Sequence, residues 1–182
     1  NTQLTDLTGL EKLEKMLGYL TIENNEQLTS LGALSSMTTA DKLIIVNNPA
    51  LTDLEGLSAL TFVKYELRVE NNPGLESLDG LSALETVQKD LRIIWNMALT
   101  DVDGLSSLTS VGDDLEIWEN LALENVDGLP SLTSVGENLS IAHPDLFTSI
   151  DGLSSLVTVG ENLSIDLVLA PDQMPGGDPV PS

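Results

Sequence analysis

The chain repeats itself with a period of 24 residues. Copies that open with Leu and continue with alternating apolar residues begin at Leu20, Leu43, Leu67, Leu91, Leu115, Leu139 and Leu163. The first step between copies is 23 residues and each later step is 24. A fixed period of this size indicates a solenoid, in which each copy forms one coil and packs against its two neighbours. The repeat therefore restricts the fold more than any other feature of the sequence.

Each copy carries three apolar ridges. Leu91 and Ile93 alternate with Arg92 and Ile94, which predicts a short strand with the latter two side chains pointing outward. The second ridge holds Leu99 and Val102, and the third holds Leu105, Leu108 and Val111. The three-residue spacing of the third ridge favours a tight helical turn over a strand. One coil cannot bury these ridges alone, so we expect coils stacked about 4.8 Å apart around continuous aliphatic columns.

Two columns of turn residues close the coil. The first is Asn, which bonds neighbouring backbone groups where a chain leaves a strand. It predicts an internal Asn ladder, interrupted by Pro144, through Asn25, Asn48, Asn72, Asn96 and Asn120. The second is Gly, usually behind Asp or Glu, and it predicts another corner at Gly9, Gly56, Gly80, Gly104, Gly128 and Gly152.

The repeats NNPALTDLEGLSAL, SLTSVGDDLEI and SLTSVGENLSI resemble the leucine-rich-type repeats of the receptor L-domain family. That family includes the ligand-binding lobes of growth-factor and insulin receptors, and bacterial and fungal surface proteins. The resemblance covers roughly Leu4 to Asp166. It implies a right-handed β-solenoid, usually outside the cell, that binds a partner without catalysis. The animal receptors also carry Cys-rich modules, and this chain has no Cys, so a hormone-receptor function does not carry over.

The fold class expected is thus all-β with short helical turns: a leucine-rich-repeat-like β-solenoid of about seven 24-residue coils. Residues 1–19 are assigned to an N-terminal cap and a first partial repeat, 20–169 to the solenoid, and 170–182 to a Pro/Gly-rich linker or tail. Within the cap, Leu10, Leu13, Met16 and Leu17 share one face of a helix drawn over 9–17, so a helical cap is predicted.

The net charge of the chain limits the kinds of partner that it can bind. The net charge is -22, all seven Lys and Arg lie at or before Arg92, and the 15 acidic residues after it have no basic neighbour in the sequence. Such a field repels nucleic acid and anionic lipid and favours cationic partners. No apolar run approaches the roughly 20 residues of a membrane-spanning helix, so we expect no membrane insertion. Aromatic residues make up 3% of the chain, and the core must therefore be aliphatic.

The two Trp residues depart from the repeat. In the predicted register, Ile94 and Trp118 are lateral neighbours on the outer strand face, and Trp95 is diagonal to Trp118. The patch predicted to contact a partner is completed by residues bordering them, and consists of Arg92, Ile94, Trp95, Trp118, Glu119 and His143. Exposed amphipathic rings on a rigid sheet are typical of binding surfaces. Rings surrounded by carboxylates also suit a sugar or a cation, while burial under the tail or self-association would give the patch a structural role.

Acidic residues stack along the second corner at Glu55, Asp79, Asp103, Asp127 and Asp151. A column of like charges raises the hypothesis of calcium binding. The alternating acids of a calcium loop are absent, so capping of the following turn by these side chains is the preferred interpretation. His143 with Asp145 and Glu119 makes a weak metal motif. No metal, cofactor or catalytic motif is predicted, and the chain is not expected to be an enzyme.

The sequence therefore predicts a non-catalytic module, extracellular or at a cell surface, that recognises a protein or glycan through its strand face. The alternative is a structural spacer or adhesin arm without a specific small ligand. Changing both Trp95 and Trp118 to Ser separates the two. A binding role predicts loss of the partner with little loss of stability, whereas loss of folding would make the rings structural.

Overall fold

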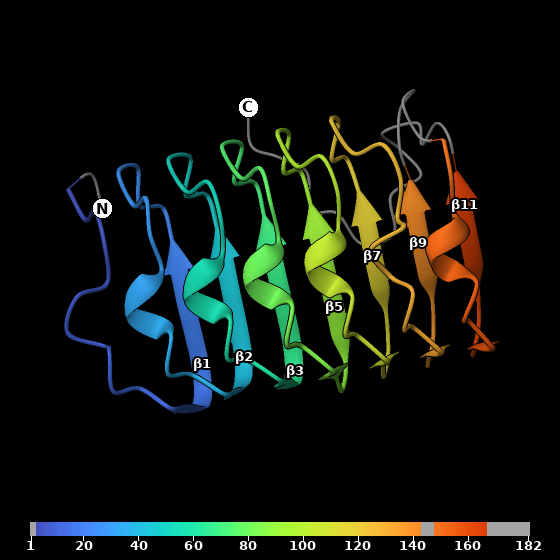
Figure 1. The fold of residues 1–182 in the computed structure, drawn as a ribbon, viewed down its shortest axis with the longest axis horizontal. Helices are drawn as coiled ribbons and strands as arrows, with labels where there is room; N and C mark the ends of the chain where they lie inside the picture. The colour runs from blue at the N-terminus through green and yellow to red at the C-terminus, as the bar shows by residue number, and fades with distance from the viewer. Residues whose placement is uncertain (1–2, 143–147, 167–182) are drawn as a thin grey trace.

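The computed structural model describes residues 3–142 and 148–166, which form a β-solenoid of about six turns. Figure 1 shows the strands as a row of parallel arrows, with the short helical turns on the side of the coil that faces the viewer. All strand pairs are parallel, and successive coils are neighbours along one sheet. The fold class predicted from the repeat is confirmed.

The main strand of each coil occupies the first apolar ridge. These strands are β1 (Lys15–Glu23), β2 (Thr39–Val46), β3 (Phe62–Glu70), β5 (Asp90–Ile94), β7 (Leu115–Trp118), β9 (Leu139–Ala142) and β11 (Leu163–Asp166). Leu67, Leu91, Leu115, Leu139 and Leu163 pair in one unbroken register. Sequence position in the repeat therefore translates directly into a position on the sheet.

A second strand column lies on the third ridge, which the spacing did not predict. It consists of the two-residue strands β4 (Thr86–Val87), β6 (Ser110–Val111), β8 (Ser134–Val135) and β10 (Thr158–Val159), joined to the first half of β3. The expected tight turns precede it as the 3-10 helices η1 (Gly32–Leu34), η2 (Glu55–Leu57), η3 (Asp79–Leu81), η4 (Asp103–Leu105) and η5 (Asp151–Leu153). Each third ridge thus starts in a turn and ends in a strand.

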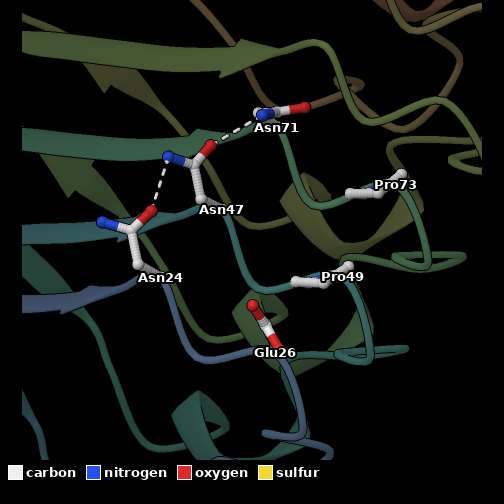
Figure 2. Close-up of a pocket in the computed structure, with 6 residues that line it drawn as sticks. All are labelled: Asn24, Glu26, Asn47, Pro49, Asn71 and Pro73. Atoms are coloured by element: carbon white, nitrogen blue, oxygen red, sulfur yellow. Dashed lines mark hydrogen bonds between the residues drawn. The ribbon is translucent and has the colours of Figure 1, made fainter. Parts of the chain in front are cut away.

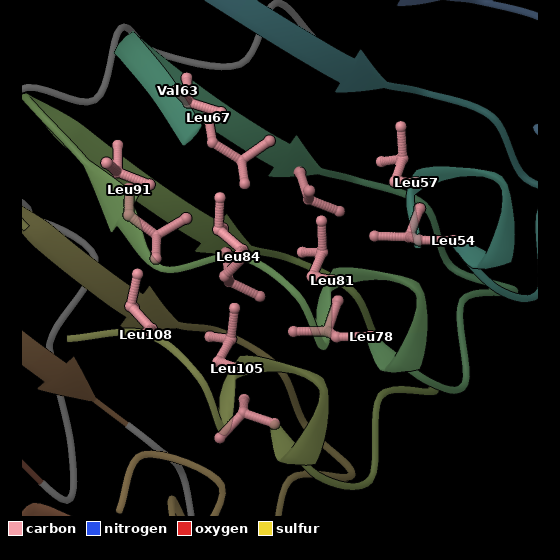
Figure 3. Close-up of a cluster of buried hydrophobic side chains, with 14 of the residues drawn as sticks. Leu54, Leu57, Val63, Leu67, Leu78, Leu81, Leu84, Leu91, Leu105 and Leu108 are labelled. Atoms are coloured by element: carbon pink, nitrogen blue, oxygen red, sulfur yellow. The ribbon is translucent and has the colours of Figure 1, made fainter. Parts of the chain in front are cut away.

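The interior consists of aliphatic columns that run along the solenoid. Leu54 stacks on Leu78, and Leu57 stacks on Leu81 and then Leu105 (Figure 3). These side chains are fully buried. Burial of a Leu stabilises a fold by about 1.5–3 kcal/mol. Stacking provides this burial because every coil covers the apolar ridges of the coil before it.

The internal Asn ladder is present and buried. The backbone N–H of Asn72 donates to the side-chain Oδ1 of Asn96 (3.1 Å), and the Asn96 N–H donates to Oδ1 of Asn120 (2.9 Å). From Asn48 to Asn120, the side-chain Nδ2 of each Asn also donates to a strand carbonyl, as that of Asn96 does to Val69 at 3.0 Å. The ladder therefore provides hydrogen-bond partners for the buried backbone groups at the point where the chain leaves each strand. Its predicted interruption at Pro144 lies outside the described residues.

The predicted helical cap over 9–17 is wrong. Lys15 and Met16 belong to β1 and pair with Thr39 and Ala40 of β2, and Leu17 is 83% exposed. The backbone N–H of Thr38 donates to the carbonyl of Glu14 at 2.8 Å, so this segment follows the path of another coil. A three-residue spacing of apolar side chains is shared by a helix face and by the turn ridge of this repeat, and pairing with β2 decides between them.

Within the described residues, no helix has the length and apolar character needed to cross a membrane. The segment assigned as a linker, 170–182, lies outside the described residues.

Candidate functional site

Both Trp side chains meet on the outer face of the sheet. Ile94, Trp118 and Ala142 stand in register at the ends of β5, β7 and β9, and Trp95 follows β5 directly. The two indole rings contact edge to face, with centroids 5.4 Å apart and planes at 78°. We refer to Ile94, Trp95, Trp118 and Ala142 as the strand-face cluster. The prediction that Trp118 is lateral to Ile94 and diagonal to Trp95 is confirmed.

The cluster is less exposed than its outward position predicts. Ile94 is 4% exposed, Trp118 5% and Ala142 6%, while Trp95 is half-buried. Ile94 points outward, as predicted, but its side chain is covered because it packs against the indole of the next coil. The cluster is a second, small apolar core on the opposite side of the sheet from the main one.

The indole nitrogen of Trp118 is the one unsatisfied polar atom in this core. Among the described side chains, Nε1 of Trp118 is the only buried nitrogen or oxygen without a hydrogen-bond partner. Buried indole N–H groups usually find an acceptor. The cluster therefore holds a hydrogen-bond donor that the described part of the protein leaves unused.

Trp95 has an unfavourable backbone conformation. Its φ is 57°, in the left-handed region, and the equivalent residues of the other coils have φ between 49° and 57°. These residues are Asn24, Asn47, Asn71 and Glu119. Asn tolerates this region through local hydrogen bonds, whereas other L-residues pay about 1–2 kcal/mol. Two coils thus carry a residue that is strained at this position, whereas three carry Asn, which suits it. Backbone strain that a protein retains in this way is typical of functional positions.

The same column forms an outer ladder of amides. Nδ2 of Asn47 donates to Oδ1 of Asn24 at 3.0 Å, and Nδ2 of Asn71 donates to Oδ1 of Asn47 at 2.6 Å. With Pro49 and Pro73, these side chains line a shallow groove of about 260 Å³, shown in Figure 2. Sequence analysis did not identify this groove. In the next two coils the same positions hold Trp95, Glu119 and the exposed Met97 and Leu121, so the outer ladder of amides ends before them.

Arg92 is engaged by carboxylates of adjacent coils. Its Nε lies 2.9 Å from Glu116, its Nη1 lies 3.1 Å from Glu66, and its Nη2 lies 3.8 Å from Asp90. Lys42 completes the network by pairing with Glu66. Although Arg92 shares the outer face with the cluster, as predicted, this network gives it the structural task of joining three coils.

The pKa values of this network follow from burial and pairing. At Arg92, burial alone would lower the pKa, but the carboxylates of Glu116, Asp90 and Glu66 outweigh it and raise the pKa above its usual value. At Glu116, burial is the largest influence and raises the pKa, and Arg92 opposes this without reversing it. The folded state thus retains a proton on Glu116 to higher pH than the unfolded chain does.

The remaining predicted site residues are placed only in part. Glu119 follows Trp118 with a half-exposed side chain. His143 and Asp145 lie outside the described residues, so their place relative to the cluster is not shown. In the parts of the chain that the structure describes, no group of three or more His, Asp or Glu side chains is arranged to hold a metal ion.

The acidic corner is stacked as predicted, but its capping residues are different. The backbone N–H of Asp103 donates to the side chain of Asp101 at 3.1 Å, and the 3-10 helix that begins at Asp103 has no side-chain cap of its own. The residue two positions before the turn plays this part in other coils too, as Ser77 does for Asp79. Assigning the cap to the Asp before Gly is therefore wrong. The pKa of Asp103 is raised, mainly by burial and further by the negative charges of Asp101, Asp79 and Asp127.

We expect the protein to become more stable when the pH is lowered from about 7 toward the unfolded pKa values of Asp and Glu, about 4. The pKa values of Glu116, Asp103 and Glu137 are raised in the folded state. Their contribution is therefore fully present below the unfolded pKa and is lost as the pH rises through the folded one. Relief of the net charge of -22 acts in the same direction. A rise in Tm of about 2–4 °C would correspond to ~1 kcal/mol for a chain of this size.

Scanning calorimetry across that pH range, with and without added salt, measures the effect. Salt should raise the Tm near pH 7 and have less influence near pH 5, because it screens the same repulsion. Hydrogen bonds from the first turn lower the pKa values of the exposed Asp6 and Glu11. A Tm that falls steadily on acidification would mean that such groups dominate and that the acidic columns cost little.

Comparison with protein-family models, with curated proteins and with solved structures gave no match to this chain.

Proposed function

We propose that this protein is a non-catalytic binding module, extracellular or at a cell surface, that recognises a partner through the strand-face cluster. The observation that carries the proposal is Trp95, which occupies a left-handed backbone position that other coils give to Asn. Asn is the favourable residue at this turn, and most coils carry it. The coil that carries Trp95 instead is the one in which the change places two indole rings in contact. Packing alone does not require that change, because coils with Asn stack in the same register.

The surroundings support a protein partner over a glycan. Two rings at 78° form a corner and not a flat platform, and a corner suits an extended peptide better than a sugar ring. The acidic half of the chain around the cluster favours a partner with cationic flanks. The resemblance to L-domain repeats also supports binding outside the cell.

We expect Trp95→Asn to abolish partner binding while leaving stability almost unchanged. The substitution removes about 1 kcal/mol of left-handed strain and offers Asn71 a further rung of the outer ladder. It loses the edge-to-face ring contact, which contributes about 0.5–1.5 kcal/mol. Equilibrium unfolding should therefore shift by less than about 1 kcal/mol, the balance of these two effects, whereas retention of the partner by the immobilised protein should be lost.

Tyr19→Ser is the matched control. Tyr19 is an aromatic residue that is 71% exposed at the other end of the same sheet, and its removal should leave binding intact. Both variants would be compared with the parent for proteins retained from the native medium and on a glycan array. Equal retention by all three chains would refute recognition through the cluster.

That result would favour a second candidate, a structural spacer of a surface protein. The uninterrupted register from β3 to β11 and the continuous internal ladder support this role, since they give the solenoid a fixed rise per coil. A spacer would need the ladder intact and would tolerate the loss of Trp95.

A further inference from the structure

The outer ladder of amides has a direction, and Glu23 sets it. A carboxylate only accepts hydrogen bonds, so Nδ2 of Asn24, which lies 2.8 Å from that of Glu23, donates to it. Oδ1 of Asn24 then accepts from Asn47, and Oδ1 of Asn47 accepts from Asn71. In Figure 2 the side-chain oxygen of Asn71 points away from Asn47. The ladder therefore ends next to the coil of Trp95 in an acceptor and not in a donor.

This last acceptor is unused. Among the residues that the structure describes, none donates a hydrogen bond to Oδ1 of Asn71. Donation along a chain of amides toward a carboxylate strengthens the last carbonyl as an acceptor, because each hydrogen bond polarises the next. The next position of the column is Trp95, whose indole stands where an Asn side chain would continue the ladder. A strengthened acceptor without a donor thus lies one coil away from the half-buried Trp95.

A second acceptor lies on the other side of Trp95. The backbone N–H of Asn71 donates to the Ile94 carbonyl at 3.0 Å, and that of Trp95 donates to the Trp118 carbonyl at 3.2 Å. Asn71, Trp95 and Glu119 therefore follow three adjacent strands. Within the described residues the Glu119 carboxylate makes no ion pair. The indole of Trp95 is thus flanked by a carbonyl and a carboxylate that both lack a donor.

In the described part of the chain, no basic side chain is placed at this indole. The cation–π contacts found there lie at Tyr19 and Tyr65. Arg68 and Arg92, which lie on the two preceding strands, are paired with carboxylates. No Lys or Arg follows Arg92 in the sequence. A Lys or Arg attracted to the acidic half of the chain must therefore come from another molecule.

We propose that Trp95 binds an arginine side chain of the protein partner, whose guanidinium packs on the indole and donates hydrogen bonds to Oδ1 of Asn71 and to the Glu119 carboxylate. Arginine fits better than lysine because its planar group stacks on aromatic rings and carries five N–H donors along its edges. The inference rests on the proposed function and specifies the chemistry of its partner. It also gives a reason for a Trp in this backbone position, since an Asn there would extend the ladder and use the acceptor of Asn71.

Titration of the full chain with the blocked peptide Gly-Arg-Gly, followed by the NMR signals of the two indole N–H groups, tests this proposal. The signal of Trp95 is assigned by its loss in Trp95→Asn, and it should shift and saturate in the millimolar range. The same peptide with citrulline in place of arginine keeps N–H donors without the charge, and should bind about ten-fold more weakly. The lysine peptide should bind about three-fold more weakly than the arginine peptide.

Variants of the two acceptors test the geometry. Asn71→Gly removes the carbonyl acceptor, while Gly accommodates the φ of 49°, and it should weaken binding of the arginine peptide about five-fold. Glu119→Gln keeps the shape of the side chain and removes its charge, and should weaken binding about three-fold. Asn24→Gly is the matched control. It removes the same kind of side chain at the far end of the ladder, where φ is 57°, and should leave binding almost unchanged.

Equal binding of the citrulline or lysine peptide, or equal affinities of Asn24→Gly and Asn71→Gly for the arginine peptide, would overturn the proposal. Retention of proteins from the native medium judges the proposed function separately. If Trp95→Asn abolishes that retention but the arginine peptide does not shift the Trp95 signal in the parent, the cluster binds its partner without arginine and only the present proposal fails. If the arginine peptide binds as expected and no protein is retained, the arginine site stands and the proposed function is refuted.

Discussion

Gly104→Ala should destabilise the protein by about 3 kcal/mol or more, beyond the usual cost of overpacking. A Cβ atom at Gly104 would lie 1.8 Å from the carbonyl oxygen of Leu78 and 2.1 Å from its carbonyl carbon. Both are backbone atoms of the preceding coil, so no side chain can move aside to make room. Relief requires η4 to withdraw from η3, which would open the aliphatic columns between them.

Gly32→Ala provides a comparison in another 3-10 helix. Gly32 is the first residue of η1, one position before Ala33, the equivalent of Gly104, and a Cβ at Gly32 meets only the side-chain oxygen of Ser30, at 3.2 Å. That substitution should be nearly neutral, within about 1 kcal/mol, since it also restricts the unfolded chain. Urea unfolding of the two variants measures the difference. Similar midpoints for both would show that close approach of the coils is not what keeps Gly at this corner.

Asn96→Ala should lower the free energy of unfolding by about 2–5 kcal/mol, the cost of burying one or two unsatisfied backbone groups. The side chain of Asn96 accepts a hydrogen bond from the Asn72 N–H and donates one to the Val69 carbonyl. Both partners are fully buried, and water cannot replace the missing amide. The effect should be seen as a lower midpoint in chemical denaturation.

Asn47→Gly tests whether the stability cost depends on burial of the ladder or on any loss of hydrogen bonds between amides. Asn47 belongs to the outer ladder at the groove edge, and Gly preserves its positive φ of 57°. Solvent can replace the lost hydrogen bonds there, so the cost should stay below about 1 kcal/mol. If the outer substitution proved as costly as the inner one, the internal ladder would have no special role in holding the coils together.

The repeat predicts the coil because a fixed period by itself shows which residues of successive copies are neighbours in space. Leu91 and Leu115 must be neighbours once each copy forms one turn, and the pairing of β5 with β7 follows. For the same reason the sequence correctly placed Trp118 beside Ile94 and the inner Asn residues in one ladder. These features depend only on position within the repeat.

Other features depend on what lies above the sheet or beside a turn, and the period does not contain that information. Alternation within β7 shows that Trp118 points outward, but it cannot show that its indole is 95% covered, the complement of its 5% exposure. The sign of φ at Trp95 became visible only in the structure, although the Asn residues in equivalent coils were a signal for it. At the N-terminal end, pairing with β2 replaced the helix that spacing alone suggested.

The unbroken register has a consequence for how such a protein changes over time. Because each coil contacts its neighbours through the same positions, removing or duplicating one 24-residue copy from the middle recreates at the new junction the contacts that existed before. The length of the molecule is therefore free to vary in whole coils, whereas a one-residue difference, such as the 23-residue step from Leu20 to Leu43, has to be absorbed by an irregularity in the strand pairing.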